Sequence, residues 1–254
     1  MSLSIAVSGK GGSGKTTVAA MIVRHLLARG ARGILAVDAD PNACLGLALG
    51  VRPETTVADI RDQTLQRTLP GSDGPDRERA FEFALHRAVT EARGFDLLAM
   101  GRPEGPKCYC AVNNLLRKYL DEAGQDYPYL VIDNEAGMEH LSRRTTDDVD
   151  HLLVVTEATA VGALTARRIL DLAAGLPIAV RSRGVLWNKA ADPAAVAAMA
   201  GDLPTVGILP YDPAVLEASM RGRTIFELGA ESPALRRVGE LLDKLTGVTA
   251  TPAS

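Results

Sequence analysis

The chain has 254 residues, of which 46% are apolar and 23% are charged, and its formal net charge is −3. This composition is ordinary for a soluble globular protein and excludes global disorder, and the small net charge gives no electrostatic reason to expect binding to nucleic acid or to an anionic membrane. The aromatic content of 4% argues against a base-stacking module, and the apolar runs are far shorter than the ~18 residues that span a bilayer.

Apolar runs alternate with helical stretches along the chain. In chain order we expect a strand at Leu3–Ser8, a helix at Lys15–Ala28, strands at Gly33–Val37 and Leu97–Met100, a helix at Ala111–Glu122, strands at Tyr129–Ile132 and Leu152–Val155, a helix at Thr159–Ala174, a strand at Gly184–Trp187, a helix at Pro193–Ala200, a strand at Val206–Leu209 and one long helix over about Ile225–Leu245. Apolar strands that alternate with helices are typical of an α/β fold, a mostly parallel sheet with helices on both faces.

Two segments depart from this alternation of strands and helices. Residues 51–94 are rich in charge and carry too little apolar content for a core of their own, so we expect a helical insertion with a mobile loop on a single domain that spans residues 1–254. Residues 247–254 are expected to form a frayed tail. The first residues, MSLSIAVSGKGG, lack the basic stretch of a signal peptide, which favours a cytoplasmic protein.

The strongest motif is GKGGSGKTT at residues 9–17, which fits G-x-x-x-x-G-K-[ST] and lies between a predicted strand and a predicted helix. Its backbone N–H groups and the positive end of the helix are suited to phosphate, Lys15 to the β- and γ-phosphates, and the Thr16 hydroxyl to Mg²⁺. The motif predicts a P-loop NTPase fold with nucleotide contacts at Gly11, Gly12, Ser13, Gly14, Lys15, Thr16 and Thr17.

A second lysine, Lys10, lies inside this loop, and the run KGGSGKTT resembles the loop of the MinD/ParA/nitrogenase-iron-protein group of ATPases. The resemblance implies a homodimer in which Lys10 reaches the nucleotide of the partner and acts in catalysis beside Lys15. The alternative is a solvated surface lysine.

Acidic residues follow two predicted strands. In the ATPase group, the run VDADPN resembles the first switch, which implies that Asp40 orients or deprotonates the attacking water and that Asp38 lies in the outer shell of Mg²⁺. The alternative for Asp40 is a helix cap, with Pro41 at the start of the next helix. Asp133 ends an apolar strand and is predicted to hold Mg²⁺, and Gly137 resembles the second-switch glycine that contacts the γ-phosphate.

Two late segments are candidates for the base. Asn188 ends a predicted strand and has an amide that can pair with an adenine edge, and Pro210, Tyr211 and Asp212 resemble the adenine loop of the group. In an N-K-x-D run, which reads guanine, the acid stands three residues after the Asn, whereas here Asp192 is one position too far along, so ATP is favoured over GTP.

Cys108 and Cys110 form a C-x-C pair after a Gly/Pro-rich loop. Thiolates are soft ligands for zinc, nickel, copper(I) or iron–sulfur centres, and two chains would supply four of them. The alternative is two incidental reduced cysteines. Cys44 is expected to be a small buried residue.

The runs GKGGSGKTT, VDADPNACLG, MGRPEGPKCYC, VIDNEAGMEHLSRRTT and LPYDP together resemble the CooC family, the nickel-insertion ATPases of carbon monoxide dehydrogenase maturation. The resemblance implies a homodimer that binds one Ni²⁺ or Zn²⁺ through two C-x-C motifs and uses ATP to deliver nickel to a client, carbon monoxide dehydrogenase or acetyl-CoA synthase. A MinD/ParA-like positioning ATPase is the first alternative, although no basic amphipathic end or basic patch is evident. An iron–sulfur reductase like the nitrogenase iron protein is the second.

Overall fold

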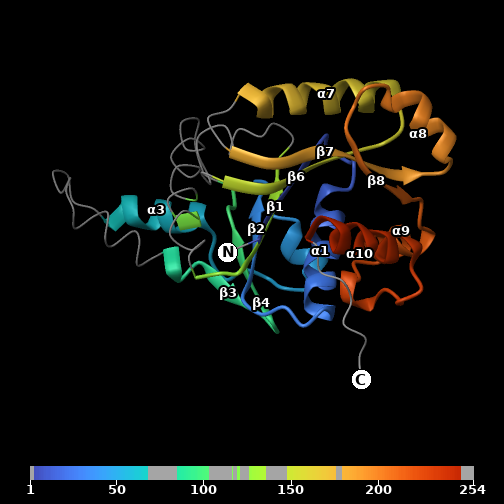
Figure 1. Cartoon of the computed structure of the whole chain (residues 1–254). Coiled ribbons are helices and arrows are strands. Elements are labelled where there is room, and N and C mark those ends of the chain that lie inside the picture. Colours follow the sequence, from blue (N-terminus) through green and yellow to red (C-terminus); the bar gives the residue numbers. More distant parts are fainter. Residues whose placement is uncertain are drawn as a thin grey trace.

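The computed structural model describes residues 3–67, 85–102, 116, 119–120, 126–135, 148–175 and 179–246. Over these residues, eight strands form one sheet in the order β3-β4-β2-β5-β1-β6-β7-β8 (Figure 1). The strands are β1 (Leu3–Gly9), β2 (Ile34–Ala39), β3 (Val89–Glu91), β4 (Phe95–Ala99), β5 (Tyr129–Asn134), β6 (Asp148–Thr156), β7 (Ala179–Ala190) and β8 (Thr205–Pro210). Every neighbouring pair is parallel except β3 and β4.

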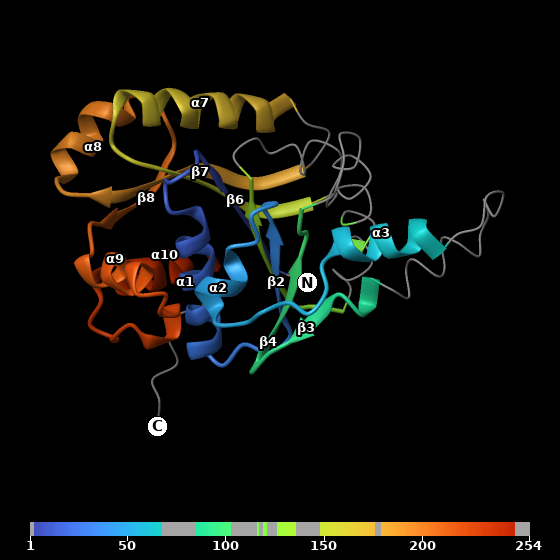
Figure 2. The same cartoon turned by 180° about the vertical axis from the view of Figure 1, so that it is seen from behind.

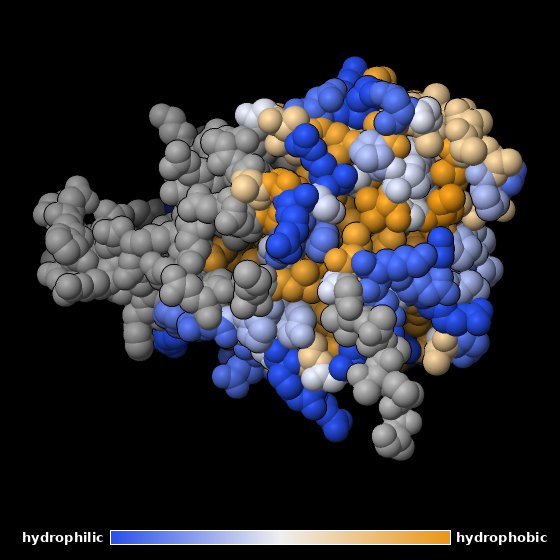
Figure 3. Space-filling view, viewed as in Figure 1, coloured by the Kyte–Doolittle hydropathy of each residue, from blue (hydrophilic) through white to orange (hydrophobic). Residues whose placement is uncertain are grey.

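Helices cover both faces of this sheet, as the two opposite views show (Figures 1 and 2). The helical elements are α1 (Lys15–Ala28), α2 (Leu45–Leu49), α3 (Val57–Arg67), α7 (Ala160–Gly175), α8 (Pro193–Ala200), α9 (Pro213–Met220), the 3-10 helix η1 (Ile225–Glu227) and α10 (Pro233–Thr246). One core joins the sheet to α3, α7 and α8, and a second core joins the other face to α1, α2, α9 and α10. In Figure 3 the Ala-rich α8 forms a weakly hydrophobic surface beside the charged side chains of α7.

The buried strands explain why the sheet has two cores. Successive side chains of a strand point to opposite faces, so a strand that is apolar throughout contributes to both. In β2, Leu35 and Val37 pack in the core of α7, whereas Ile34 and Ala36 pack in the core of α1. The carboxyl ends of the parallel strands lie together between these two helical layers, where open α/β sheets bind ligands.

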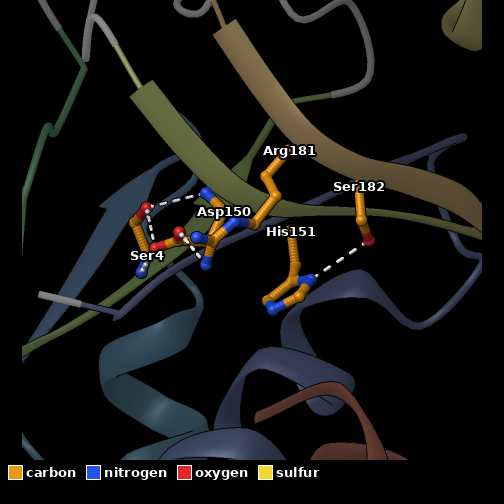
Figure 4. A network of polar contacts seen from close by, with 5 residues as sticks. All are labelled: Ser4, Asp150, His151, Arg181 and Ser182. Carbon is orange, nitrogen blue, oxygen red and sulfur yellow. Dashed lines mark hydrogen bonds and ion pairs between the residues drawn. The ribbon is translucent and has the colours of Figure 1, made fainter. Parts of the chain in front are cut away.

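At the opposite, amino-terminal ends of the strands, polar side chains near the starts of β1, β6 and β7 contact one another (Figure 4). Asp150 accepts hydrogen bonds from the backbone N–H of Ser4 at 2.9 Å and from its hydroxyl at 3.1 Å, and it pairs with Arg181 at 3.4 Å. The nearly buried His151 contacts the Ser182 hydroxyl at 3.1 Å, and burial lowers its pKa. This network links three neighbouring strands, β1, β6 and β7, near their first residues, away from their carboxyl ends.

The α/β prediction is confirmed, and three of its details are corrected. The helix expected over Ile225–Leu245 is two elements, η1 and α10, because Gly229 and Pro233 interrupt the pattern and α10 begins only at Pro233. The short antiparallel strand β3 and the helix α9 were not predicted. Of the helix expected at Ala111–Glu122, only three residues are described, and all three are helical and buried: Leu116, Tyr119 and Leu120.

The charged segment 51–94 contributes to the main core through its described ends. Val57, Ala58 and Ile60 of α3 and the later Leu85 and Ala88 are all buried in the core that also holds α7. The few apolar residues of this segment therefore stabilise the sheet domain. Its central residues, 68–84, and the expected tail at 247–254 lie outside the described residues.

Candidate nucleotide site

The loop between β1 and α1 has the backbone that phosphate binding requires. Gly14, the residue that precedes α1, has a φ of 94°, in the left-handed region that favours glycine. A Cβ atom there would lie 2.4 Å from the side-chain nitrogen of Asn188, so a larger residue would also displace the Asn188 amide. Lys15 begins the helix and is 7% exposed, it lines the cavity beside the loop, and its ammonium group lowers the pKa of Asp133.

A cavity of about 480 Å³ opens beside this loop. It is lined by three groups of residues that are far apart in the sequence: the loop and start of α1 (Gly12, Gly14, Lys15, Thr16 and Thr17), the end of β7 (Asn188 and Lys189) and the end of β8 with the two residues that follow it (Pro210, Tyr211 and Asp212). Apolar side chains of α1 and α9, among them Met21 and Val215, complete the wall. The structure thus brings the predicted phosphate residues and the predicted base residues together in one cavity of the size that holds a small ligand.

The polar groups at the base end of the cavity already have partners within the chain. Asn188 donates to the Ser13 carbonyl at 2.8 Å and accepts from the Lys189 N–H at 2.9 Å. The Asp212 carboxylate accepts from Ala214 N–H at 3.0 Å, from the Ser232 hydroxyl at 2.5 Å and from Ala234 N–H at 3.3 Å. The Asp212 carboxylate therefore accepts from the first turns of both α9 and α10, so its oxygens already have partners within the chain.

Asp192, which stands one position too far along for a guanine-binding N-K-x-D run, also has a partner within the chain. Asp192 accepts from the Ala194 N–H at 2.8 Å and is the N-cap of α8. Asp192 is not among the residues that line the cavity, and the Asp212 carboxylate accepts from three donors of α9 and α10. The preference for ATP over GTP stays a prediction from the sequence.

Asp38 and Asp133 end neighbouring strands and are paired in the register of β2 and β5. Both are fully buried. Burial and then repulsion from Asp133 raise the pKa of Asp38 to about 7. Burial likewise raises the pKa of Asp133 to about 6, although the Thr16 hydroxyl and the Lys15 ammonium group lower it. Two buried carboxylates this close disfavour each other's charge, which a divalent cation would relieve.

The two acids differ in their hydrogen bonds. Asp38 accepts from the backbone N–H groups of Asp40, at 3.2 Å, and of Leu45, at 2.7 Å. Among the described residues, neither carboxylate oxygen of Asp133 has a hydrogen bond of normal geometry, although the Thr16 hydroxyl lies close enough to lower the pKa of Asp133. An orphaned buried carboxylate near the Thr16 hydroxyl fits Mg²⁺, an oxygen-seeking cation, so the residues present fit the expected ion. The engaged oxygens of Asp38 agree with an outer-shell role.

Asp40 lies beyond the end of β2 and is partly exposed. Its carboxylate accepts from the backbone N–H and the side-chain amide of Asn42, both at 2.9 Å, in a turn of its own. The interpretation of Asp40 as a helix cap is wrong, because α2 begins only at Leu45 and the Leu45 N–H bonds to Asp38. Pro41 does not start that helix either.

The remaining predicted residues fall into two groups. Lys10 and Gly11 are exposed on the loop, where Lys10 contributes its carbonyl to a 3.2 Å turn contact with Ser13 N–H. Gly137, Cys108 and Cys110 lie outside the described residues.

Cys44 was predicted to be buried, and it is an exposed free cysteine just before α2. Within the described ranges, no group of three or more His, Cys, Asp or Glu side chains is placed to hold a metal ion.

Two functional candidates were missed by the sequence analysis. The Lys189 ammonium group contacts the Gly12 carbonyl at 2.8 Å and the Glu157 carboxylate at 2.7 Å. Glu157 follows β6 directly, so the general tendency of ligand sites to gather at strand carboxyl ends was the available signal.

The comparisons with known proteins agree with this geometry. An ATP-binding protein of Methanocaldococcus jannaschii is 38% identical over 95% of this chain and 97% of its own. The carbon monoxide dehydrogenase accessory protein CooC of Rhodospirillum rubrum is 33% identical over 92% of both chains. The crystal structure of septum site-determining protein MinD from Pyrococcus horikoshii, complexed with Mg-ADP, superposes with a TM-score of 0.70 at 22% identity, over 99% of this chain and 100% of that one.

In the described part of the chain, no helix is both long enough and apolar enough to cross a membrane. Residues 4–225 match the CobQ/CobB/MinD/ParA nucleotide binding domain, and this range includes the phosphate loop, both buried acids and the base end of the cavity. From this match and from the cavity that the loop builds, we conclude that the chain is a P-loop ATPase of the CobQ/CobB/MinD/ParA family.

Proposed function

We propose that this ATPase is a nickel metallochaperone of the CooC type, which binds Ni²⁺ between two copies of the chain and delivers it to carbon monoxide dehydrogenase or acetyl-CoA synthase. The observation that carries the proposal is the similarity to CooC at 33% identity over 92% of both chains, joined to the C-x-C pair of this sequence. Cys108 and Cys110 supply two soft ligands, and a two-fold axis between chains doubles them to the four that a closed metal site needs.

Within the ATP site, the chain's own groups divide the work of hydrolysis. Lys15 and the loop amides hold the phosphates, and Mg²⁺, when bound at Asp133 and Thr16, neutralises charge on the phosphate oxygens. Asp40 orients or deprotonates the attacking water, and its partial exposure beyond β2 leaves it accessible to that water. Lys10 is exposed on the loop, so it is available to the nucleotide of a second copy.

Metal and ATP are coupled in this proposal because each needs the same two-chain state. A ligand that stabilises the dimer favours the binding of the other ligand by the same factor. Ni²⁺ is therefore expected to bind at one ion per two chains and to raise the dimer fraction, and ATP is expected to strengthen this effect.

The test is a Ni²⁺ or Zn²⁺ titration followed by light scattering and metal analysis. Cys108→Ser and Cys110→Ser are expected to abolish metal-driven dimerisation while ATP still binds to the monomer. Lys10→Ala is expected to keep metal-driven dimerisation and to weaken ATP hydrolysis. Cys44→Ser is the matched control, because Cys44 is an exposed free cysteine outside the C-x-C pair. One metal ion per chain, or equal dimerisation of the cysteine variants, would refute the shared site.

Two other outcomes point to the alternative functions. A brown chromophore in the anaerobically purified protein, with iron and sulfide, would favour an iron–sulfur reductase. ATP-dependent binding to vesicles or DNA, with no response to nickel, would favour a positioning ATPase.

A further inference from the structure

Side chains at the end of β7 hold two consecutive carbonyl groups of the phosphate loop. The Lys189 ammonium group donates to the Gly12 carbonyl, and the Asn188 amide donates to the Ser13 carbonyl, both at 2.8 Å. Both residues line the nucleotide cavity. The loop is glycine-rich and therefore conformationally permissive, so contacts from outside it are needed to fix its peptide planes.

These contacts set the direction of the amide hydrogens. A trans peptide is planar, so its C=O and N–H point in opposite directions. A Gly12 carbonyl directed toward β7 turns the Ser13 N–H away from β7, where it closes the turn onto Lys10 at 3.2 Å. A Ser13 carbonyl directed toward β7 likewise turns the Gly14 N–H toward the loop interior. Preorganised N–H groups of this kind stabilise phosphate charge without reorganisation at the moment of reaction.

Lys189 is itself held in an unusual position. Its φ of 53° lies in the left-handed region that non-glycine residues rarely adopt, and the β7–β8 pairing is irregular between Trp187 and Ala190. Glu157, from the end of β6, binds the ammonium group at 2.7 Å. The side chains of this pair are 43% and 45% exposed, and ion pairs this exposed contribute little to folding stability.

From this arrangement we propose that Lys189 is a positioning residue of the phosphate loop and that Glu157 holds its ammonium group on the Gly12 carbonyl. Lys189 acts on ATP through the loop and does not bind the phosphates itself. The inference concerns the ATP site alone and holds whether or not the chain carries nickel.

The experiment measures competition of ATP, inorganic pyrophosphate and adenosine against a fluorescent ATP analogue, in buffer with Mg²⁺ and without nickel. Lys189→Met is expected to weaken ATP and pyrophosphate binding by about 3- to 10-fold, the usual range for a lost charge-assisted hydrogen bond that is partly solvated. Adenosine binding is expected to stay within about twofold, because adenosine has no phosphate to contact the loop. Lys189→Arg retains a charged donor and is expected to restore most of the loss.

Variants of Glu157 distinguish a positioning role of Lys189 from direct contact between Lys189 and phosphate. If Lys189 works through the loop, Glu157→Ala weakens pyrophosphate binding about 2- to 3-fold, Glu157→Gln, which keeps an acceptor, restores it, and the double variant with Lys189→Met is no weaker than Lys189→Met alone. If Lys189 instead binds phosphate directly, removal of the competing carboxylate strengthens pyrophosphate binding, which would overturn the proposal.

The matched control breaks an exposed ion pair elsewhere. Arg167 pairs with Asp202 between α7 and the turn after α8, with side chains that are 44% and 78% exposed. Arg167→Met is expected to leave binding of all three competitors unchanged. Unchanged pyrophosphate binding in Lys189→Met, with adenosine also unchanged, would likewise refute the positioning role.

Discussion

Asp212 provides a direct test of these assignments, because its carboxylate accepts hydrogen bonds from the first turns of two helices. One oxygen accepts from Ala214 N–H in α9, and the other accepts from the Ser232 hydroxyl and from Ala234 N–H in α10. Asp212 and Ser232 are 7% and 3% exposed. Replacement by alanine removes the cap of α9 and the contact to Ala234 N–H in α10, and it leaves the buried Ser232 hydroxyl, which still accepts from Leu235 N–H, without an acceptor for its own hydrogen.

The expected cost follows from these contacts. Each lost cap destabilises by about 1 kcal/mol, and a buried hydroxyl without an acceptor costs about 1–3 kcal/mol. Asp212→Ala should therefore lower the free energy of unfolding by about 3–5 kcal/mol, measured by urea denaturation. Asp192→Ala is the control, because Asp192 also precedes a Pro-initiated helix and caps α8 only, so its loss should cost about 1 kcal/mol.

The intermediate variant tests the assignment of each oxygen. Asp212→Asn keeps an acceptor for Ala214 N–H but puts a donor in place of the acceptor for Ser232, so its cost should fall between the other two. Equal destabilisation by Asp212→Ala and Asp192→Ala would refute the double cap and return the Asp212 carboxylate to the list of nucleotide contacts.

Three further predictions concern the ATP site. Asp40→Asn should retain ATP binding and lose hydrolysis by about 10²–10⁴-fold, measured as phosphate release, because a group that orients or deprotonates water contributes this much; wild-type turnover would exclude the role. Lys15→Ala should lose ATP binding itself, measured by equilibrium dialysis. The pKa values of Asp38 and Asp133, about 7 and about 6, lie above those of the unfolded chain, so the folded state binds extra protons. Without metal and nucleotide, the protein should therefore lose stability as the pH rises from about 4 to about 7, and urea unfolding of Asp38→Asn should show a flatter profile.

Much of the ATP site follows from the sequence because its parts are local. The phosphate loop is one continuous run, and Asp38 and Asp133 each end an apolar strand. Parallel strands place their carboxyl ends at one edge, so local patterns are sufficient to bring these residues together. The shared register of Asp38 and Asp133 and the common cavity of Asn188 and Tyr211 follow from that rule.

Other features depend on partners that no local pattern identifies. Asp212 could be placed in the loop after β8, but its second cap requires α10 to start 21 residues later, at Pro233. Lys189 contacts Gly12 and Glu157, which are 177 and 32 residues away along the chain. Cys44 lies in an apolar run, yet the turn formed by Asp40 and Asn42 delays the helix and leaves the cysteine exposed. Sequence spacing sets the strand ends, whereas tertiary contacts decide what each polar side chain does there.

Hydrogen bonding distinguishes the structural acids from the functional ones. Asp212 and Asp150 are each satisfied by N–H and O–H donors of the chain, as buried polar groups usually are. Asp133 makes no hydrogen bond of normal geometry to a donor in the described part of the chain, and it is paired in register with the buried Asp38. Folding alone would favour a neutral pair at this position, since two buried carboxylates side by side cost stability. The cost is explained if the fold leaves the Asp133 oxygens open so that Mg²⁺ and ATP supply the compensating contacts, and ligand binding and stability then rise together.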